Sequence, residues 1–177
     1  MVLLVIDAQN AITNDRLYRF QEFVSTVKTL IKTARENNIE VIFARHDDGA
    51  GTPMTKGLDG FEIYGEFAPE QDEKIFDKQV NSPFRDTGLA EYLSEKGETE
   101  LIITGLQTDY CIDAAVKCGF ERGYKIIVPR LANTTFDNSF MTAEKCCDYY
   151  NNFIWNGRYA ECISADNTIL KMKGLQK

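Results

Sequence analysis

Three residues whose side chains can combine in nucleophilic chemistry each come at or beyond the end of an apolar run. Asp7 directly follows one such run, Lys78 lies just beyond a second, and Cys111 lies in a glycine-containing turn after a third. Short apolar runs predict buried strands, and open α/β sheets hold their ligands at the carboxyl ends of their strands. We therefore expect a carboxylate, an ammonium and a thiol to meet at one edge of a sheet, as a nucleophile and its activators.

Cys111 is the expected nucleophile, because a thiolate attacks a carbonyl carbon readily. It stands where the helix after the turn should begin, exposed at the edge of the sheet, and the partial positive charge of a helix N-terminus favours the thiolate. Asp7 could accept the thiol proton and return it to the leaving group, while Lys78 stabilises both anions. Backbone N–H groups of the turn 105–111 could bind the oxyanion of a tetrahedral intermediate.

Each of these residues also has an ordinary structural explanation. A cysteine at the start of a helix can fill a small space in the core, Asp7 can cap a helix or a turn, and a single lysine is usually a solvated charge. The coincidence of all three residue types at strand ends favours the catalytic interpretation over three separate ones.

The composition argues against several classes of function. The 177 residues, 44% of them hydrophobic, suffice for a full core in one domain spanning residues 1–177. The net charge of −7, with lysine and arginine scattered along the chain, disfavours nucleic acid and anionic membranes as partners. No apolar stretch approaches the roughly 20 residues that span a bilayer, and the N-terminus lacks the features of a signal peptide, so we expect a cytoplasmic protein.

Cysteine and histidine usage bears on redox state and metals. The five cysteines are odd in number and include no CxxC pair, which is typical of reduced thiols. His46 is the only histidine, which excludes an HExxH motif and any zinc site with several histidines. We therefore expect no metal and no cofactor.

The apolar pattern predicts alternating strands and helices. Strands are expected at residues 2–6, 39–44, 74–76, 101–104, 125–128 and 159–163, and helices at about 16–37, 87–96 and 110–122. A further amphipathic helix is predicted by apolar residues spaced three and four apart, which are Phe140, Ala143, Cys147, Tyr150 and Ile154. Alternation of this kind predicts an α/β fold, a three-layer α-β-α sandwich around a mainly parallel sheet of six strands.

Between the second and third expected strands, residues 46–72 predict a long loop punctuated by glycines. Loops longer than about 12–15 residues are uncommon in compact domains and are often functional. Because this loop follows the carboxyl end of a strand, we expect it to roof the site.

Three segments in order resemble the motifs of one known family, the isochorismatase-like cysteine hydrolases. Residues 3–10, LLVIDAQN, resemble the family's opening aspartate motif; residues 78–84, KQVNSPF, resemble its lysine motif; and residues 105–111, GLQTDYC, resemble its nucleophile turn. With the later stretch 119–129, the resemblance covers nearly the whole chain. The superfamily includes nicotinamidases, N-carbamoylsarcosine amidohydrolases and isochorismatases.

The resemblance implies a Rossmann-like fold with a parallel six-stranded sheet and a catalytic triad of Asp7, Lys78 and Cys111. It also implies a cis peptide bond between Leu106 and Gln107, and an oxyanion hole formed by the N–H groups of Gln107 and Cys111. Family members usually form dimers or tetramers, so we expect a homodimer or a homotetramer.

Departures from the family patterns narrow the expected activity. Nicotinamidases carry an Asp-x-His pair after the second strand and a further histidine, and bind a metal there, whereas residues 45–48 of this chain read RHDD. They also have an aromatic residue five positions after the aspartate, where this chain has Ile12. Isochorismatases that cleave a vinyl ether typically lack the cysteine, so the presence of Cys111 favours acyl transfer.

We therefore expect a cofactor-free cysteine hydrolase that cleaves the C–N bond of a small amide or ureido compound. Candidate substrate-contacting residues are Ile12, His46, Phe84 and Tyr110. Two alternatives stay open at this point, hydrolysis of a vinyl ether by Asp7 alone and a non-catalytic interaction domain on the same fold. The sequence does not name the substrate.

Overall fold

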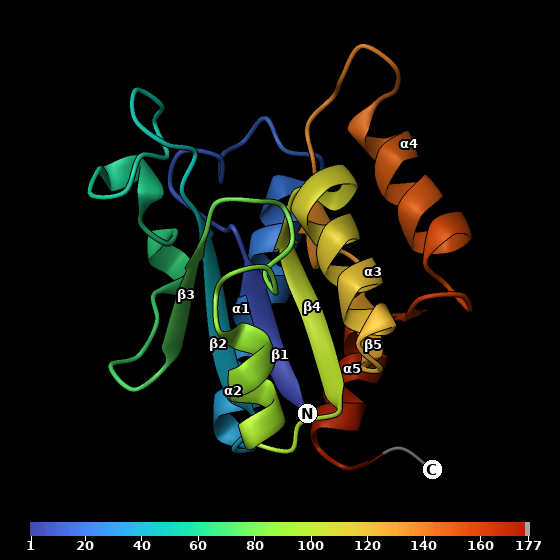
Figure 1. The fold of residues 1–177 in the computed structure, drawn as a ribbon. Helices are drawn as coiled ribbons and strands as arrows, with labels where there is room; N and C mark the ends of the chain where they lie inside the picture. The colour runs from blue at the N-terminus through green and yellow to red at the C-terminus, as the bar shows by residue number, and fades with distance from the viewer. Residues whose placement is uncertain (176–177) are drawn as a thin grey trace.

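The computed structural model describes residues 1–175 as a twisted sheet with helices on both faces (Figure 1). The strand order is β3-β2-β1-β4-β5-β7, with the short β6 paired to β4, and all pairings between these strands are parallel. The strands are β1 Val2–Ile6, β2 Glu40–His46, β3 Lys74–Lys78, β4 Glu100–Leu106, β5 Lys125–Pro129, β6 Asn133–Thr134 and β7 Glu161–Ile163. The mainly parallel α/β sandwich predicted from the sequence is confirmed, with β6 as a strand beyond the six expected.

Residues 1–175 form five α-helices and four further helical turns. The helices are α1 Phe20–Glu36, α2 Leu89–Glu95, α3 Asp113–Glu121, α4 Ala143–Asp148 and α5 Ala165–Met172. Two 3₁₀ turns, η1 Asp59–Phe61 and η2 Gly65–Phe67, lie within the expected long loop, and two π-helical turns, η3 Thr108–Ile112 and η4 Tyr149–Ile154, adjoin α3 and α4. No helix of residues 1–175 has both the length and the apolar composition needed to cross a bilayer.

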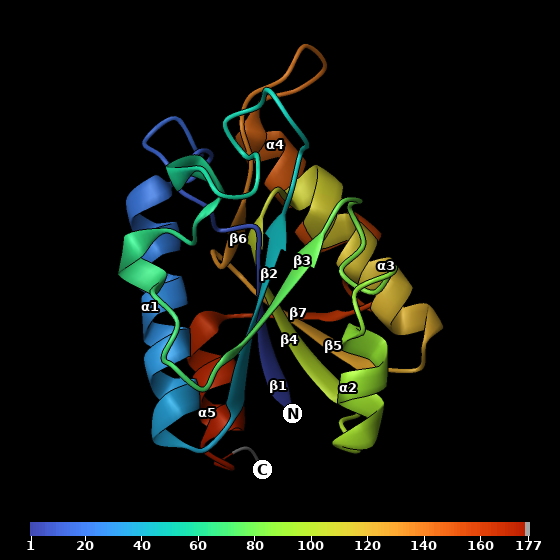
Figure 2. The same cartoon turned by 60° about the vertical axis from the view of Figure 1, so that its left-hand side comes forward.

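The wholly apolar β1 is explained by the two layers that cover it. Successive side chains of a strand point to opposite faces, so Leu3 and Val5 pack with α1 and α5, while Val2, Leu4 and Ile6 pack with α2 and α3. Figure 2 shows α1 and α5 on one side of the sheet and α2 and α3 on the other. A strand covered on both faces must be apolar throughout.

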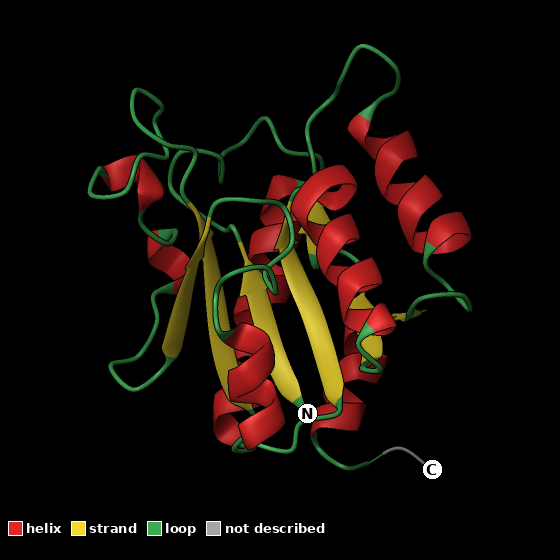
Figure 3. Cartoon of the chain, viewed as in Figure 1, coloured by secondary structure: helices red, strands yellow, loops and turns green. Residues whose placement is uncertain are grey.

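The order of the strands brings the chemically active segments to one edge. The chain passes from β1 to β2 and β3 on one side of β1 and then returns to β4 on its other side, which makes a topological switch point. The longest loops gather at the carboxyl end of the sheet (Figure 3). The segments that follow β1 and β4 therefore meet at the place where open α/β sheets hold ligands.

A glycine at the end of β4 permits this close approach. Gly105 pairs with Ile6, and a Cβ built on Gly105 would lie 1.9 Å from the Ile6 carbonyl oxygen. Its φ of 123° also lies in a region that only glycine occupies readily. Gly105 belongs to the strand itself, whereas the sequence pattern predicted it in the turn.

Several element boundaries differ from those predicted. α1 begins at Phe20 because Arg19 has a left-handed φ of 51°. The helix expected from residue 140 begins at Ala143, so the predicted inward-facing Phe140 precedes it and is 92% exposed. The two-residue β6 and the terminal α5 were not predicted. β7 and α5 join the same sheet and the same core as the preceding elements.

Candidate active site

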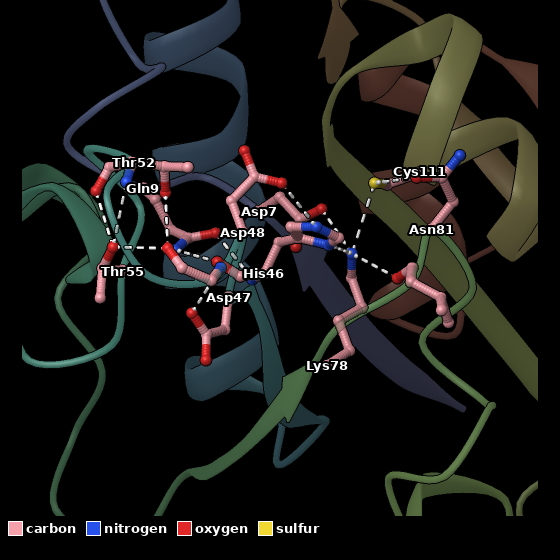
Figure 4. Close-up of polar contacts among 12 residues, drawn as sticks. Asp7, Gln9, His46, Asp47, Asp48, Thr52, Thr55, Lys78, Asn81 and Cys111 are labelled. Carbon is pink, nitrogen blue, oxygen red and sulfur yellow. Dashed lines mark hydrogen bonds and ion pairs between the residues drawn. The ribbon is translucent and has the colours of Figure 1, made fainter.

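The ammonium of Lys78 is the centre of a buried polar cluster at the carboxyl end of the sheet. Its Nζ lies 2.7 Å from Asp7 Oδ2, 3.0 Å from His46 Nδ1 and 3.3 Å from Cys111 Sγ. It also donates to the Val80 carbonyl oxygen at 3.2 Å. Figure 4 shows Lys78 between His46 on one side and Cys111 on the other. The three residues predicted as a triad therefore lie together.

Four acceptors surround an ammonium that has three N–H groups. The Cys111 sulfur is the weakest of these acceptors while it belongs to a neutral thiol, because thiol sulfur accepts hydrogen bonds poorly. The sulfur is thus the acceptor that gains most if it becomes a thiolate, because a charged acceptor attracts an N–H more strongly than a neutral one.

Lys78 and Asp7 are both positioned by the ends of strands. Lys78 is the last residue of β3, not the residue after it, and its side chain is fully buried. Asp7 follows β1 with a left-handed φ of 50°, a conformation in which aspartate is enriched, and its N–H donates to the carbonyl oxygen of Ala44 in β2. Its Oδ1 has no hydrogen-bond partner among the described residues. One oxygen of a buried carboxylate is therefore available to a further proton donor.

Cys111 lies in a π-helical turn that runs directly into α3, among the first helical residues after β4. β4 ends at Leu106, the Leu106–Gln107 peptide bond is cis as the family resemblance implied, and the turn Thr108–Ile112 follows. Cys111 is only 8% exposed, so the prediction of an exposed thiol is wrong. Besides Lys78, the sulfur lies 3.7 Å from Asn81 Oδ1, and the Asp7 carboxylate is within 4.8 Å of it.

A polar network supports this turn from behind. Thr108 donates to Asn133 Oδ1 at 2.8 Å, and the side-chain amides of Asn133 and Asn151 exchange two hydrogen bonds of 3.0 Å. Asn151 also donates to the Cys147 carbonyl. These groups are buried, so each hydrogen bond removes the cost of an unpaired polar atom. The network ties the turn Thr108–Ile112 to β6 and α4.

The electrostatics of the thiol differ from the expectation. Burial, reinforced by the neighbouring Asp7 charge, raises the pKa of Cys111 to about 12, although Lys78 acts in the opposite direction. Burial also raises the pKa of Asp7, and Lys78 again opposes the shift. Burial therefore outweighs the stabilisation of the thiolate that was expected from the helix N-terminus and from Lys78. The resting cysteine is a thiol beside a carboxylate of raised basicity.

Three residues of this cluster have the spacing of metal ligands. One donor atom from each of Asp7, His46 and Cys111 lies within 4.8 Å of the others. The Lys78 ammonium is within 3.3 Å of all three side chains. These donor atoms thus surround the ammonium of Lys78. Its positive charge would repel a metal ion bound beside it. A metal-free site stays a prediction.

The other candidate residues are placed in different surroundings. Ile12 packs against the α1 face of the core, and Phe84 is buried on the α2–α3 face with its ring stacked on Tyr124 and beneath the Arg122 guanidinium. Tyr110, next to Cys111, is 54% exposed. Of these, only Tyr110 presents a largely accessible side chain beside the thiol. Substrate contact by any of them stays a prediction.

The long loop is firmly attached to the segment after β1. The fully buried Gln9 donates to the carbonyl oxygens of His46 and Phe61, and its own Oε1 accepts from the His46 N–H. A backbone hydrogen bond of 2.9 Å runs from the Asn10 N–H to the Glu62 carbonyl oxygen. In Figure 4, loop residues Thr52 and Thr55 lie on the His46 side of the cluster, away from Cys111. Gln9 and Asn81 were overlooked in the sequence although both lie within the quoted motifs.

A family model described as the isochorismatase domain matches residues 1–145. Similar known proteins include the secreted isochorismatase effector Isc1 of Verticillium dahliae, 28% identical over 130 residues, with 72% of this chain and 68% of that protein covered. Nicotinamidase 3 of Arabidopsis thaliana is 26% identical over 155 residues, covering 80% and 76%. Streptothricin hydrolase of Streptomyces noursei is 26% identical over 137 residues, covering 76% of this chain, which spans about half the length of that relative.

Solved structures share the fold. A putative hydrolase of the isochorismatase family from Chromobacterium violaceum superimposes with a TM-score of 0.91 at 22% identity, covering 98% of this chain and 93% of the other. The strand order, the cluster of Asp7, Lys78 and Cys111, and the match over residues 1–145 lead to one conclusion. The chain belongs to the isochorismatase family of hydrolases.

Proposed function

We propose that this protein is a cysteine hydrolase that cleaves the C–N bond of a small amide or ureido compound, with Asp7, Lys78 and Cys111 as its catalytic residues. The observation that carries the proposal is the position of Lys78 Nζ, 2.7 Å from Asp7 Oδ2 and 3.3 Å from Cys111 Sγ in a buried cluster. An ammonium in that position stabilises a thiolate as it forms and keeps the carboxylate oriented toward the thiol.

The first half of the reaction forms a thioester. Because the resting thiol is protonated, proton transfer accompanies the attack: Asp7 takes the proton from Cys111 while the sulfur bonds to the substrate carbonyl carbon. The raised pKa of Asp7 makes it a better proton acceptor than a surface carboxylate. The tetrahedral intermediate then collapses, the C–N bond breaks, and ammonia or the amine leaves with the proton from Asp7.

The second half restores the enzyme. Asp7, again ionised, accepts a proton from water while the water oxygen attacks the thioester carbonyl. The C–S bond breaks, the acid is released, and the departing sulfur takes the proton back from Asp7. Each cycle consumes one water and leaves Asp7 and Cys111 in their starting protonation states, so no cofactor is required.

We assign the oxyanion hole to the N–H groups of Gln107 and Cys111. In an α-helical turn the Cys111 N–H would donate to the Gln107 carbonyl, four residues before it. Within residues 1–175 that carbonyl instead accepts from Tyr110 and Ile112, and Cys111 is not among its donors. The π-helical turn thereby supports a role for the Cys111 N–H in binding negative charge.

The amide class of substrate is supported by the chemistry of the site and by the name of one relative. Nicotinamidase 3 of Arabidopsis is named for an amide substrate. A thiol nucleophile suits acyl transfer, whereas protonation of an ether needs an acid alone. Single-domain action of residues 1–177, a cytoplasmic location and a homodimer or homotetramer belong to the same proposal.

One observation favours a second candidate. A carboxyl whose pKa is raised by burial is also a better reservoir of a proton, so Asp7 could act as the acid in hydrolysis of a vinyl ether. Cys111 would then be dispensable. Whether activity requires Cys111 therefore distinguishes the two candidates.

Ammonia release from a panel of small amides and ureido compounds, without added metal, tests the proposal. The proteins are wild type, Cys111→Ala and, as a matched control, Cys118→Ala, because Cys118 lies on the following helix outside the cluster. We expect release by wild type and by Cys118→Ala, and none by Cys111→Ala. Equal release by Cys111→Ala would refute the covalent mechanism, and vinyl ether hydrolysis that survives Cys111→Ala would establish the second candidate.

A further inference from the structure

Both ring nitrogens of His46 are occupied by charged partners. Nδ1 lies 3.0 Å from Lys78 Nζ, and Nε2 lies 3.2 Å from Asp48 Oδ1. An ammonium has no lone pair and can only donate, so Nδ1 must be the acceptor. Nε2 then carries the ring proton and donates it to the Asp48 carboxylate. No hydrogen-bonding atom of this ring is left for a substrate.

The sheet register creates the contact with Lys78. His46 is the last residue of β2, Lys78 is the last residue of β3, and the two are direct partners in the parallel pairing. Registered partners of neighbouring strands point their side chains to the same face. The pairing of the two strands therefore makes the imidazole and the ammonium neighbours, whichever rotamers the side chains adopt.

Gln9 fixes the backbone of His46 in the same place. Its carboxamide accepts from the His46 N–H at 2.8 Å and donates to the His46 carbonyl at 3.0 Å. Gln9 is fully buried and has a third bond, to Phe61 in the long loop. A residue held by two backbone bonds and two ring bonds has little freedom, which is what the support of a reactive group requires.

Lysine needs such support because its ammonium ends a flexible four-carbon chain. Asp7 and the Val80 carbonyl oxygen bind two N–H groups of the ammonium, and a further acceptor is needed to hold the third. His46 supplies that acceptor from β2, and Figure 4 shows its ring between Asp48 and Lys78.

We propose that His46 is a positioning residue: its Nδ1 accepts a hydrogen bond from Lys78 and holds the ammonium between Asp7 and Cys111, while Asp48 keeps the ring proton on Nε2. The inference deepens the proposed cysteine hydrolase mechanism and depends on it for its catalytic meaning. It replaces the expectation that His46 contacts substrate.

The first test reads the ring directly and needs no substrate. Because His46 is the only histidine, long-range ¹H–¹⁵N spectra of wild-type protein labelled at histidine report on this ring alone. We expect a proton on Nε2, an unprotonated Nδ1, and a shift of the Nδ1 resonance in Lys78→Met, which removes the donor. A proton on Nδ1 at neutral pH overturns the proposal, whether the ring is the neutral Nδ1-H tautomer or a doubly protonated imidazolium.

The second test uses two substitutions that each preserve one ring position. Asparagine places an amide oxygen near the position of Nδ1, and glutamine places its amide near Nε2. The readout is the rate at which iodoacetamide alkylates Cys111, measured by the mass of the Cys111 peptide because the chain has five cysteines. We expect alkylation to fall about tenfold or more in His46→Gln and in His46→Ala, and His46→Asn to recover most of that loss, since misplacement by about 1 Å can cost a hundredfold.

Faster alkylation of Cys111 in His46→Gln than in His46→Asn would overturn the proposal. Equal alkylation rates in His46→Asn and His46→Ala would do the same. Circular dichroism and urea midpoints of the three variants establish that each is folded before rates are compared. Failure of the hydrolase proposal is recognised separately, by ammonia release that survives Cys111→Ala. In that case the tautomer of wild-type His46 still decides whether the ring accepts a hydrogen bond from Lys78.

Discussion

The carboxylate of Asp7 and the ammonium of Lys78 form an ion pair that solvent does not reach. Their Oδ2 and Nζ atoms are 2.7 Å apart, and the two side chains are 2% and 0% exposed. The residues are 71 positions apart in the chain and come from the ends of β1 and β3. Desolvating two charges is costly, and removing only one partner leaves an uncompensated buried charge.

Lys78→Met is therefore expected to lower the free energy of unfolding by about 3–5 kcal/mol, the usual cost of breaking a buried pair from one side. The double variant Asp7→Asn, Lys78→Met should regain much of that stability, since neither charge remains, and should stay inactive. Urea unfolding with a common m-value measures both effects. A Lys78→Met midpoint equal to that of wild type would show that the pair is not coupled to the fold.

Asp7→Asn should make Cys111 more reactive toward iodoacetamide while abolishing hydrolysis. The Asp7 charge contributes to the raised pKa of the thiol, so removing it lowers that pKa. At pH 8 the thiolate fraction, and with it the alkylation rate of the Cys111 peptide, rises about tenfold for each pKa unit. Slower alkylation in Asp7→Asn would mean that the carboxylate activates the resting thiol instead of opposing its ionisation.

Alkaline pH should weaken the fold through Cys111. Its folded pKa of about 12 lies above the ordinary value of 9.0, so the folded state keeps a proton that the unfolded state loses. The thiol's contribution to stability is fully present below pH 9 and is lost as pH rises from 9 toward 12, by about 1.4 kcal/mol per pH unit. Urea unfolding between pH 8 and 10.5 should therefore show a shrinking difference between wild type and Cys111→Ala. A constant difference would contradict the raised pKa.

Gly105→Ala should disrupt the junction between β1 and β4. The added Cβ would meet the Ile6 carbonyl oxygen at 1.9 Å, and backbone cannot yield as a flexible side chain can. We expect a loss of at least about 1–3 kcal/mol and a collapse of activity, because Asp7 follows Ile6 directly. Gly65→Ala is the matched control, since its Cβ meets nothing within 4 Å, and should stay within about 0.5 kcal/mol of wild type. Equal stability of the two variants would refute the close-contact argument.

The sequence predicted the features that local patterns control. Apolar runs located six strands of the sheet to within about two residues, and the residue types at their ends identified Asp7, Lys78 and Cys111 as a group. The family resemblance supplied the order of the motifs and the cis peptide at Leu106. Each of these features depends on a segment of fewer than about ten residues.

Features that depend on tertiary contacts were missed. The contact between His46 and Lys78 follows from the register of β2 and β3, which no local pattern reveals. The raised pKa of Cys111 follows from burial, which outweighs the effects of the helix N-terminus and of Lys78 that the sequence suggested. β6 has two residues, too few for a periodic signal, and the left-handed φ of Arg19 shortened α1 against its apolar pattern.

The most direct test of the central claim is partitioning of the acyl-enzyme with hydroxylamine, using a compound from the panel that releases ammonia. A thioester on Cys111 reacts with hydroxylamine as well as with water, so wild type should form the hydroxamate, or the hydroxyurea from a ureido substrate, in proportion to the hydroxylamine added. Cys111→Ala should form neither this product nor ammonia. Ammonia release by wild type with no hydroxylamine adduct at any concentration, or the same products from Cys111→Ala, would contradict a covalent intermediate on Cys111.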